Sequence, residues 1–277
     1  IILVKRHGVA KISGVYQRSG FFMKKFSFLA AVCALLVAAA PALAATELSV
    51  FAAASMNESM TEIAEMYKKV APDVSIVYNF DSSGTLKTQI EQGAECDIFI
   101  SAGQKQMDQI NDTHVMPGTR FNIVSNKVVL IVPKGNNPTG IASFDDIATD
   151  KVTLIALGNS DGPVGQYSEE IFRHMGVWDK LNGENKISFA SNVKEVLAQT
   201  ESAAVSCGVV YGTDAATSDK VDVVAGAPAG SHKPIVYPAA ILKGTKHEAA
   251  AKAFVEYLKG PEATAVFERI GFAIPEK

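Results

Sequence analysis

Apolar and polar positions follow two rhythms along the chain from about residue 46 onward. Short β-branched and apolar runs predict strands, whereas apolar residues that recur every three or four positions predict helices. The predicted strands cover residues 48–52, 74–80, 96–101, 128–132, 152–157, 205–211, 221–225 and 234–242. The predicted helices cover residues 56–70, 84–91, 104–111, 163–175, 192–201 and 247–270, with a short helix at "FDDIA" and a break near Gly260 and Pro261.

This alternation of strand and helix predicts an α/β fold with mainly parallel sheets flanked by helices. In open sheets of this kind, ligands bind at the carboxyl ends of the strands, where the following helices begin. We therefore expect the functional residues at junctions between a strand and a helix.

The first 44 residues have the pattern of an export signal rather than of a fold. A basic start, "MKK", leads into an apolar segment and then into the small-residue cleavage pattern "PALA". We expect residues 23–44 to be a signal peptide cleaved near Ala44 and Ala45, and residues 1–22 to be an upstream extension outside the mature protein. An uncleaved membrane helix is the alternative, but about 15 apolar residues fall short of the roughly 20 that span a bilayer.

Removing this segment makes the chain strongly acidic. The full chain carries 26 Lys and Arg against 29 Asp and Glu. Residues 1–44 contain six of the basic residues and none of the acidic ones, which leaves a mature net charge of about −9. Such a chain has no general attraction for nucleic acid or for an anionic membrane. A bound anion would have to be held by local geometry.

Two of the three cysteines, Cys96 and Cys207, remain in the mature chain. Each lies in an apolar run, and in an exported protein they could form a disulfide. Their positions in two separate predicted strands favour buried free thiols instead. Cys33 could carry a lipid anchor, but Val32 precedes it where a small residue would be expected.

Five junctions carry groups that could donate hydrogen bonds to an anion. Ser55 in "FAAAS" and Ser83 in "FDSSGT" each follow a strand, and their hydroxyls would lie near free amides at a helix start. The glycine-rich loop 158–167 exposes further amides. Val193 in "SNVKEV" offers a first-turn amide, and Tyr211 ends a strand in "GVVYGTDA". Each has an ordinary alternative, since a serine can simply cap a helix and the valine and tyrosine can be core contacts.

A serine hydrolase is the rival interpretation of one junction. Residues 158–162 fit G-x-S-x-G between a strand and a helix, which would make Ser160 the nucleophile, and Asp214 and His232 follow in the required order. Pro163 directly after the motif and the lack of an upstream HGGG-type oxyanion loop argue against it. The sequence also has no P-loop, no G-x-G-x-x-G and no clustered His and Cys ligands. We therefore expect neither catalysis nor a cofactor.

Several stretches in the same order resemble the periplasmic molybdate-binding proteins of ABC transporters. These are "LSVFAAAS", "FDSSGTLKTQIEQGAECDIFISA", "GVVYGTDA", "VYPAAIL" and "YLKGPEATAVFERIGF", and the resemblance covers nearly all of residues 47–273. It implies a two-domain, type II-like periplasmic binding protein that holds molybdate or tungstate in the interdomain cleft. Matched position by position, the resemblance places the ligands, as hydroxyls and backbone N–H groups without protein–metal bonds, at Ser55, Ser83, Val164, Val193 and Tyr211.

The resemblance also implies a location and partners. We expect an exported, extracytoplasmic monomer that delivers the oxyanion to the membrane permease of an ABC importer and has no nucleic-acid partner. Strand order and the return of the C-terminal helices predict two domains joined by two crossovers. One domain would comprise residues 46–124 plus 239–277, and the other residues 125–238.

Other tetrahedral oxyanions remain alternatives. Sulfate has the same need for donors, and the sequence does not measure the size of the cavity. Phosphate would carry a proton that needs an acceptor, which Asp81 or Asp161 could supply. Asp81 and Gly84 stand where some family members have small or hydroxyl residues, and Val164 stands where alanine occurs, so pocket volume and charge are less constrained than the ligands themselves.

Overall fold

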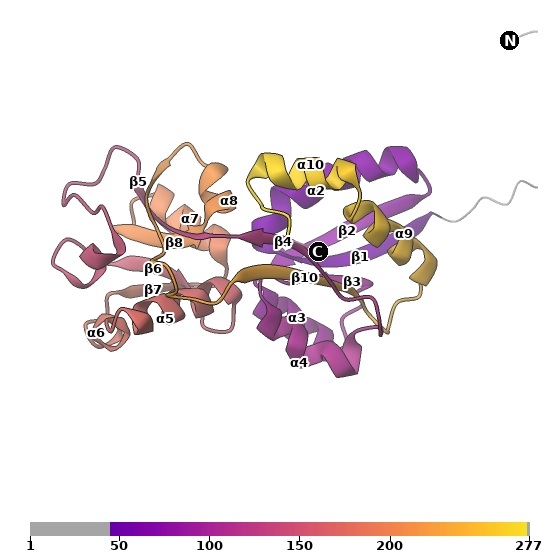
Figure 1. The fold of residues 1–277 in the computed structure, drawn as a ribbon, viewed down its shortest axis with the longest axis horizontal. Coiled ribbons are helices and arrows are strands. Elements are labelled where there is room, and N and C mark those ends of the chain that lie inside the picture. The colour runs from indigo at the N-terminus through magenta and orange to yellow at the C-terminus, as the bar shows by residue number, and fades with distance from the viewer. Residues whose placement is uncertain (1–44, 276–277) are drawn as a thin grey trace, which may run out of the picture. The chain divides into compact units, whose positions relative to one another are not determined.

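The computed structural model describes residues 45–275, so the predicted upstream extension and signal peptide lie outside the described residues. Two five-stranded sheets form the centres of two lobes (Figure 1). The strands of lobe I are β1 (Thr46–Ala53), β2 (Val74–Asp81), β3 (Ile98–Ile100), β4 (Phe121–Asn126) and β10 (Ile235–Ile241). The strands of lobe II are β5 (Val128–Pro133), β6 (Ile155–Gly158), β7 (Ile187–Ala190), β8 (Cys207–Tyr211) and β9 (Val221–Gly226).

The two sheets share one topology, with orders β2-β1-β3-β10-β4 and β7-β6-β8-β5-β9. Each is mainly parallel and contains one antiparallel strand, which is β10 in lobe I and β5 in lobe II. Both antiparallel strands enter their lobe from the other one, since β5 follows β4 after Lys127 and β10 follows β9. The predicted two-domain α/β fold is therefore confirmed. The exact domain limits remain a prediction, because a strand that crosses between lobes has no sharp boundary.

Helices cover the sheets of both lobes (Figure 1). In lobe I they are α2 (Asn57–Val70), α3 (Ser83–Glu91), α4 (Gln104–His114), α9 (Glu248–Leu258) and α10 (Pro261–Ile270), with a 3-10 turn η1 (Ala54–Met56) before α2. In lobe II they are α5 (Pro163–His174), α6 (Trp178–Gly183), α7 (Val193–Glu201) and α8 (Gly212–Ala216), with a 3-10 turn η2 (Phe144–Ala148). No described helix is long and apolar enough to cross a membrane.

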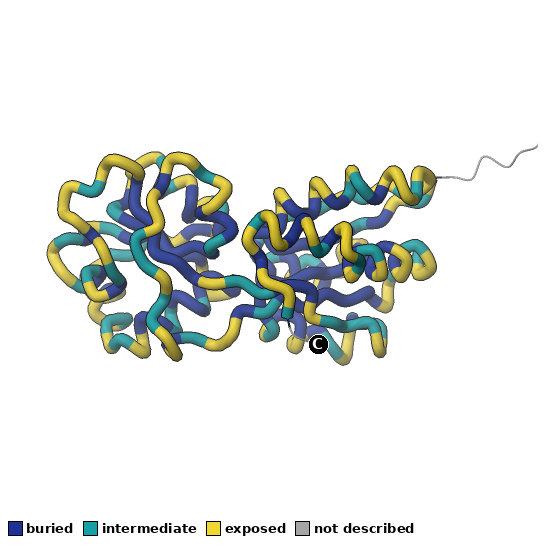
Figure 2. Tube along the Cα trace, turned by 45° about the horizontal axis from the view of Figure 1, so that its top comes forward, coloured by how far each residue is buried: buried dark blue, intermediate teal, exposed yellow. Residues whose placement is uncertain are grey.

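The two faces of the lobe I sheet are buried under different helices. Successive side chains of a strand point to opposite faces, so Val50 and Ile98 pack in the core that includes residues of α2 and α9, whereas Phe51 and Phe99 pack with residues of α3 and α4. Figure 2 shows the resulting pattern, in which the strands are buried and the outer sides of the helices are exposed. Burial on both faces explains why these strands are nearly continuous apolar runs in the sequence.

Several elements differ from the pattern-based expectation. The short elements β4, α6, β7 and α8 were not predicted, and β6 begins at Ile155 rather than at Val152. Cys96 lies just before β3 instead of within it. Cys96 and Cys207 are both buried and free, as the sequence favours.

Candidate functional site

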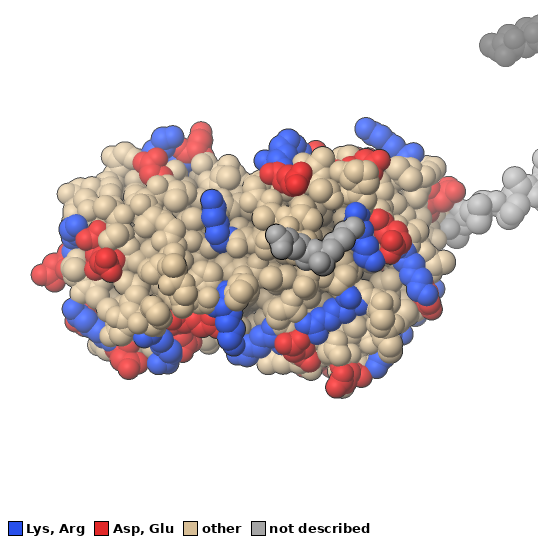
Figure 3. All heavy atoms as spheres, viewed as in Figure 1, with Lys and Arg blue, Asp and Glu red and all other residues tan. Residues whose placement is uncertain are grey.

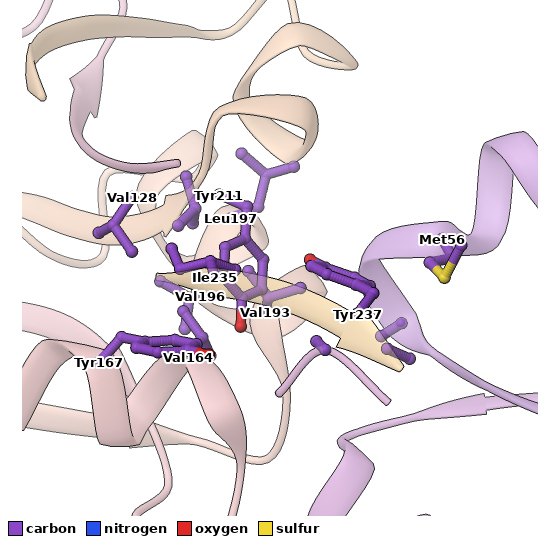
Figure 4. Close-up of a cluster of buried hydrophobic side chains, with 14 of the residues drawn as sticks. Met56, Val128, Val164, Tyr167, Val193, Val196, Leu197, Tyr211, Ile235 and Tyr237 are labelled. Atoms are coloured by element: carbon purple, nitrogen blue, oxygen red, sulfur yellow. The ribbon is translucent and has the colours of Figure 1, made fainter. Parts of the chain in front are cut away.

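A small cavity of about 20 Å³ lies between the lobes. It is bounded by the carboxyl ends of strands and by the helix starts that follow them. All five residues selected from the sequence line it: Ser55 and Ser83 from lobe I, and Val164, Val193 and Tyr211 from lobe II. Figure 4 shows the three lobe II residues gathered beside Tyr237 of the crossing strand β10.

The two serines of lobe I are buried, and each has one partner inside the protein. Ser83 is the first residue of α3, and its Oγ accepts a hydrogen bond of 2.9 Å from the backbone N–H of Ala102. Ser55 lies in η1, and its Oγ is 2.9 Å from the hydroxyl oxygen of Tyr237. Each hydroxyl is therefore oriented by a neighbour from another element, which for Ser55 is 182 positions away along the chain.

The helices of lobe II begin with free amides at the cavity. In α7 the side chain of Asn192 accepts hydrogen bonds from the N–H groups of Lys194 and Glu195, at 3.0 and 3.2 Å. The amide of Val193 has no acceptor within the helix, since the first N–H groups of any helix lack one. In α5, Pro163 occupies the first position, so the first available amide is that of Val164.

Tyr211 contributes a hydroxyl at the end of β8. The residue is almost fully buried, and its oxygen has no hydrogen-bond partner among the described residues. Burial raises the pKa of Tyr211 well above its ordinary value, so the hydroxyl keeps its proton. An unpaired buried hydroxyl costs about 1–3 kcal/mol, which an acceptor bound in the cavity would offset. Among the residues that the structure describes, the Oγ of Ser82 is also buried without a partner.

The cavity offers donors rather than formal positive charge. Within residues 45–275, its lining includes no Lys, Arg or His, and Asp81 is its only charged residue. One carboxylate oxygen of Asp81 accepts hydrogen bonds from the backbone N–H of Ser82 (2.7 Å) and from Nδ2 of Asn192 across the cleft (3.0 Å). Asp161 is exposed and does not line the cavity. On the face shown in Figure 3, acidic and basic side chains are interspersed over both lobes.

The lobes meet closely beside the cavity. A Cβ atom at Gly84 would meet the carbonyl oxygen of Asp161 and lie 2.7 Å from its carbonyl carbon. The side chain of Gln106 donates to the same carbonyl oxygen at 2.9 Å. A Cβ atom at Gly162 would likewise meet Oγ of Ser82. Glycine at position 84 is therefore required for the lobes to approach as they do, whereas a side chain at position 162 would require the Ser82 hydroxyl to turn away.

An ion-pair cluster joins the lobes next to Val193. Nζ of Lys194 is 2.8 Å from both carboxylate oxygens of Glu58, which lies on α2 of lobe I. It is also 3.0 Å from Oδ1 of Asp214, which is fully buried in α8. Burial raises the pKa of Asp214 to about 6, although Lys194 opposes the shift. Burial lowers the pKa of Lys194, but the two carboxylates outweigh it and leave the pKa raised.

The residues of the rival hydrolase interpretation are not brought together. Asp214 faces Lys194, and Nδ1 of His232 pairs with the backbone oxygen of Lys233 at 2.7 Å. No hydrogen bond among the described residues joins Ser160 to either of them. The same part of the chain contains no group of three or more His, Cys, Asp or Glu that could hold a metal ion. The structure gives the hydrolase interpretation no support.

Sequence reasoning missed four residues that shape the site. Asn126 ends β4 and Tyr237 lies on β10, beside the two connections between the lobes, and Glu58 and Lys194 join the lobes. The local signal was weak: Tyr237 interrupts the apolar run of β10 as a polar group, and Asn126 lies in "SNK" between two strands. Their roles depend on contacts between distant segments, which no local pattern contains.

Comparison with known proteins places this architecture among transport proteins. Residues 48–273 match the family model described as bacterial extracellular solute-binding protein. The chain is similar to the molybdate-binding protein ModA of Escherichia coli, with 39% identity over 82% of this chain and 89% of that protein. It is also similar to ModA of Haemophilus influenzae, with 37% identity over 83% of this chain and 91% of that protein. The solved periplasmic molybdate-binding protein of Azotobacter vinelandii superposes with a TM-score of 0.72 at 28% identity, over 83% of this chain and all of that one.

Proposed function

Because the chain belongs to the family of bacterial extracellular solute-binding proteins, we propose that it captures molybdate or tungstate in the cleft and delivers it to an ABC importer. The similar ModA proteins are named as molybdate-binding proteins. On this proposal the protein is an exported, monomeric carrier with the permease as its partner, and it has no catalytic activity, cofactor or nucleic-acid partner of its own.

One observation supports an oxyanion as the substrate. Hydroxyls of lobe I, together with a hydroxyl and free helix-start amides of lobe II, converge on one cavity whose described lining includes no cation. The proposed ligands are the hydroxyls of Ser55, Ser83 and Tyr211 and the amides of Val164 and Val193. Molybdate is a fully deprotonated tetrahedral dianion at neutral pH, so it accepts hydrogen bonds at every oxygen and donates none. The site and the ion are complementary in this respect.

Five neutral donors supply a gross binding energy of the order that a micromolar site needs. A hydrogen bond to a charged group contributes roughly 1.5–3 kcal/mol, so five donors give about 8–15 kcal/mol before desolvation and closure costs. A micromolar dissociation constant corresponds to about 8 kcal/mol. The absence of a lysine or arginine at the cavity also avoids a permanent counter-ion that would favour every anion.

The anion series tests this assignment. We expect molybdate and tungstate to raise the melting temperature most and nearly equally, because they have almost the same size, charge and shape. Sulfate has shorter bonds to oxygen, so several donors would be too distant to bond well, and its shift should be far smaller. Monohydrogen phosphate should give the smallest shift, because its proton would face a donor. The measurement is thermal unfolding with the four anions at equal concentration.

A larger shift with sulfate or phosphate would overturn the substrate assignment while leaving the oxyanion-binding class intact. Phosphate requires an acceptor, and the one acidic residue that lines the cavity, Asp81, already accepts two hydrogen bonds through one oxygen.

An assay of ester hydrolysis with Ser160→Ala as control addresses catalysis separately. Hydrolysis that depends on Ser160 would refute the proposal of a non-enzymatic carrier.

Adjacent serines provide a matched pair of variants. We expect Ser83→Ala to weaken molybdate binding by roughly ten- to a hundredfold, which corresponds to about 1.5–3 kcal/mol for a hydroxyl that donates to a charge. The change also leaves the buried N–H of Ala102 without its acceptor. Ser82→Ala should cost less, because the position-by-position resemblance places the ligand at Ser83 and not at Ser82. Titration calorimetry measures the molybdate dissociation constant of each variant. Equal losses of affinity in the two variants would show that Ser83 is not the preferred ligand.

A further inference from the structure

Tyr237 links the cavity to both crossing segments between the lobes. It lies on β10, is fully buried, and its hydroxyl is 2.9 Å from Oγ of Ser55. Nδ2 of Asn126, at the end of β4, lies 3.3 Å from the same hydroxyl oxygen. Figure 4 shows Tyr237 between the lobe II residues of the cavity and Met56 of lobe I. Tyr237 does not itself line the cavity.

The orientation of Asn126 sets the direction of its hydrogen bond to Tyr237. Its Oδ1 accepts the backbone N–H of Lys127 at 2.9 Å, and its Nδ2 donates to Oγ1 of Thr213 at 2.9 Å. The amide nitrogen therefore faces Tyr237, and because an NH₂ group has no acceptor capacity, the tyrosine oxygen accepts this bond. The one proton of the tyrosine is then available for Ser55.

A hydrogen bond from Tyr237 to Ser55 leaves the hydroxyl proton of Ser55 free to point into the cavity. If Tyr237 donates to Oγ of Ser55, the serine oxygen is an acceptor on its protein side and its O–H points elsewhere. Ser83 has the same arrangement, because the N–H of Ala102 donates to its Oγ. Burial raises the pKa of Tyr237 well above its ordinary value, so the tyrosine keeps its proton at neutral and mildly alkaline pH.

We propose that Asn126 and Tyr237 are positioning residues that fix Ser55 as a hydrogen-bond donor and so make the site select fully deprotonated oxyanions over protonated ones. The chain of donors runs from the amide of Asn126 through the two hydroxyls to the bound anion. This inference rests on the proposed oxyanion-binding function. It adds a specificity role for two residues that do not touch the ligand.

Tyr237→Phe tests the role of the hydroxyl with little change in volume. Without the tyrosine proton, Ser55 can turn its own proton away from the cavity and present a lone pair to a protonated anion. We expect molybdate affinity to fall about three- to tenfold, the effect of one ordinary hydrogen bond. Affinity for monohydrogen phosphate at pH 8 should fall less or rise. The measured quantity is the ratio of the two dissociation constants by calorimetry, and this ratio should change at least about threefold.

A control and a second variant separate positioning from a general loss of stability. Tyr78→Phe removes another hydroxyl of lobe I, which donates to the backbone oxygen of Met60 at 2.9 Å away from the cavity, and it should leave the ratio unchanged. Asn126→Asp places an acceptor where Nδ2 now donates, so Tyr237 would donate to the carboxylate instead of to Ser55. The added negative charge weakens all dianions alike, but the ratio should shift in the same direction as in Tyr237→Phe.

The outcomes are distinguishable from those of the proposed function. If wild-type protein prefers sulfate to molybdate, the substrate assignment fails, but the ratio of sulfate to monohydrogen phosphate still tests the positioning role, because sulfate is also fully deprotonated. An unchanged ratio in both Tyr237→Phe and Asn126→Asp would overturn the positioning role while leaving the anion specificity of the wild type in place. Failure of the wild type to bind any of these anions would refute both proposals.

Discussion

Replacing Gly84 by alanine is expected to weaken molybdate binding by at least about a hundredfold without destabilising the ligand-free protein. The new Cβ atom would meet the backbone carbonyl of Asp161 in the opposite lobe, 2.7 Å from its carbon. Carbon atoms pack at about 3.5–4.0 Å, so the lobes would have to stay about 1 Å further apart. Hydrogen-bond donors on one lobe would then be too far from an anion that is bound to the other lobe. The loss of two such hydrogen bonds corresponds to roughly 3–6 kcal/mol.

The fold itself should tolerate this change. Gly84 lies in the first turn of α3, and alanine favours a helix over glycine by about 0.5–1 kcal/mol. We expect ligand-free Gly84→Ala to melt no lower than the wild type, while calorimetry shows the loss of affinity and small-angle scattering shows less compaction with molybdate. Gly183→Ala is the control, because Gly183 lies in α6 of lobe II and a Cβ atom there would have no neighbour within 4 Å. Undiminished affinity in Gly84→Ala would mean that the bound state does not bring Gly84 and Asp161 together.

Asp214→Asn is expected to remove a pH dependence of about 3 kcal/mol from the free energy of unfolding. Burial raises the pKa of Asp214 from 3.8 to about 6 in the folded protein, against the opposing influence of Lys194. Between these two values the folded state binds more protons than the unfolded state, so the free energy of unfolding falls as pH rises. A shift of about two pKa units corresponds to about 3 kcal/mol. The contribution is present below about pH 4 and lost above about pH 6.

Denaturant unfolding of wild type and variant at pH 4 and pH 7 gives this difference. Carboxylates such as Glu95 and Asp146, whose pKa is lowered by hydrogen bonds from lysines, add the opposite slope to both proteins and cancel in the comparison. Asp108→Asn, which removes an exposed partner of Arg120, is the control and should follow the wild type. A constant difference between wild type and Asp214→Asn across this range would show that Asp214 does not titrate as its burial implies.

Every described strand that is buried along most of its length was predicted from the sequence. Strands such as β1 and β8 are continuous apolar runs because helices cover both sides of the sheet. The missed strands β4 and β7 lie at the edges of their sheets. Only two residues of β4 and one of β7 are buried, and Phe189 in β7 is exposed, so neither has the composition or alternation of a core strand.

The candidate site divides in a similar way. Positions at helix starts follow from local rules about strand ends and free amides, and the structure brings all five into one cavity. Their supporting contacts are not local: Ser55 and Tyr237 are 182 positions apart, and Glu58 and Lys194 are 136 apart. Such pairs depend on how the lobes are placed by the two connections between them, β4 to β5 and β9 to β10. No periodic pattern in a single sequence indicates which residues will meet in this way.

The placement of β10 has a consequence for the order in which the protein can be completed during synthesis. Lobe II is built from one continuous segment, β5 to β9, whereas the sheet of lobe I needs β10 between β3 and β4. Until the ribosome has produced that strand, β3 keeps an unpaired edge, and the helices α9 and α10 of lobe I have not yet been made. Lobe II can therefore fold while lobe I is still incomplete, and the emerging chain holds an unfinished half until its last helices are made.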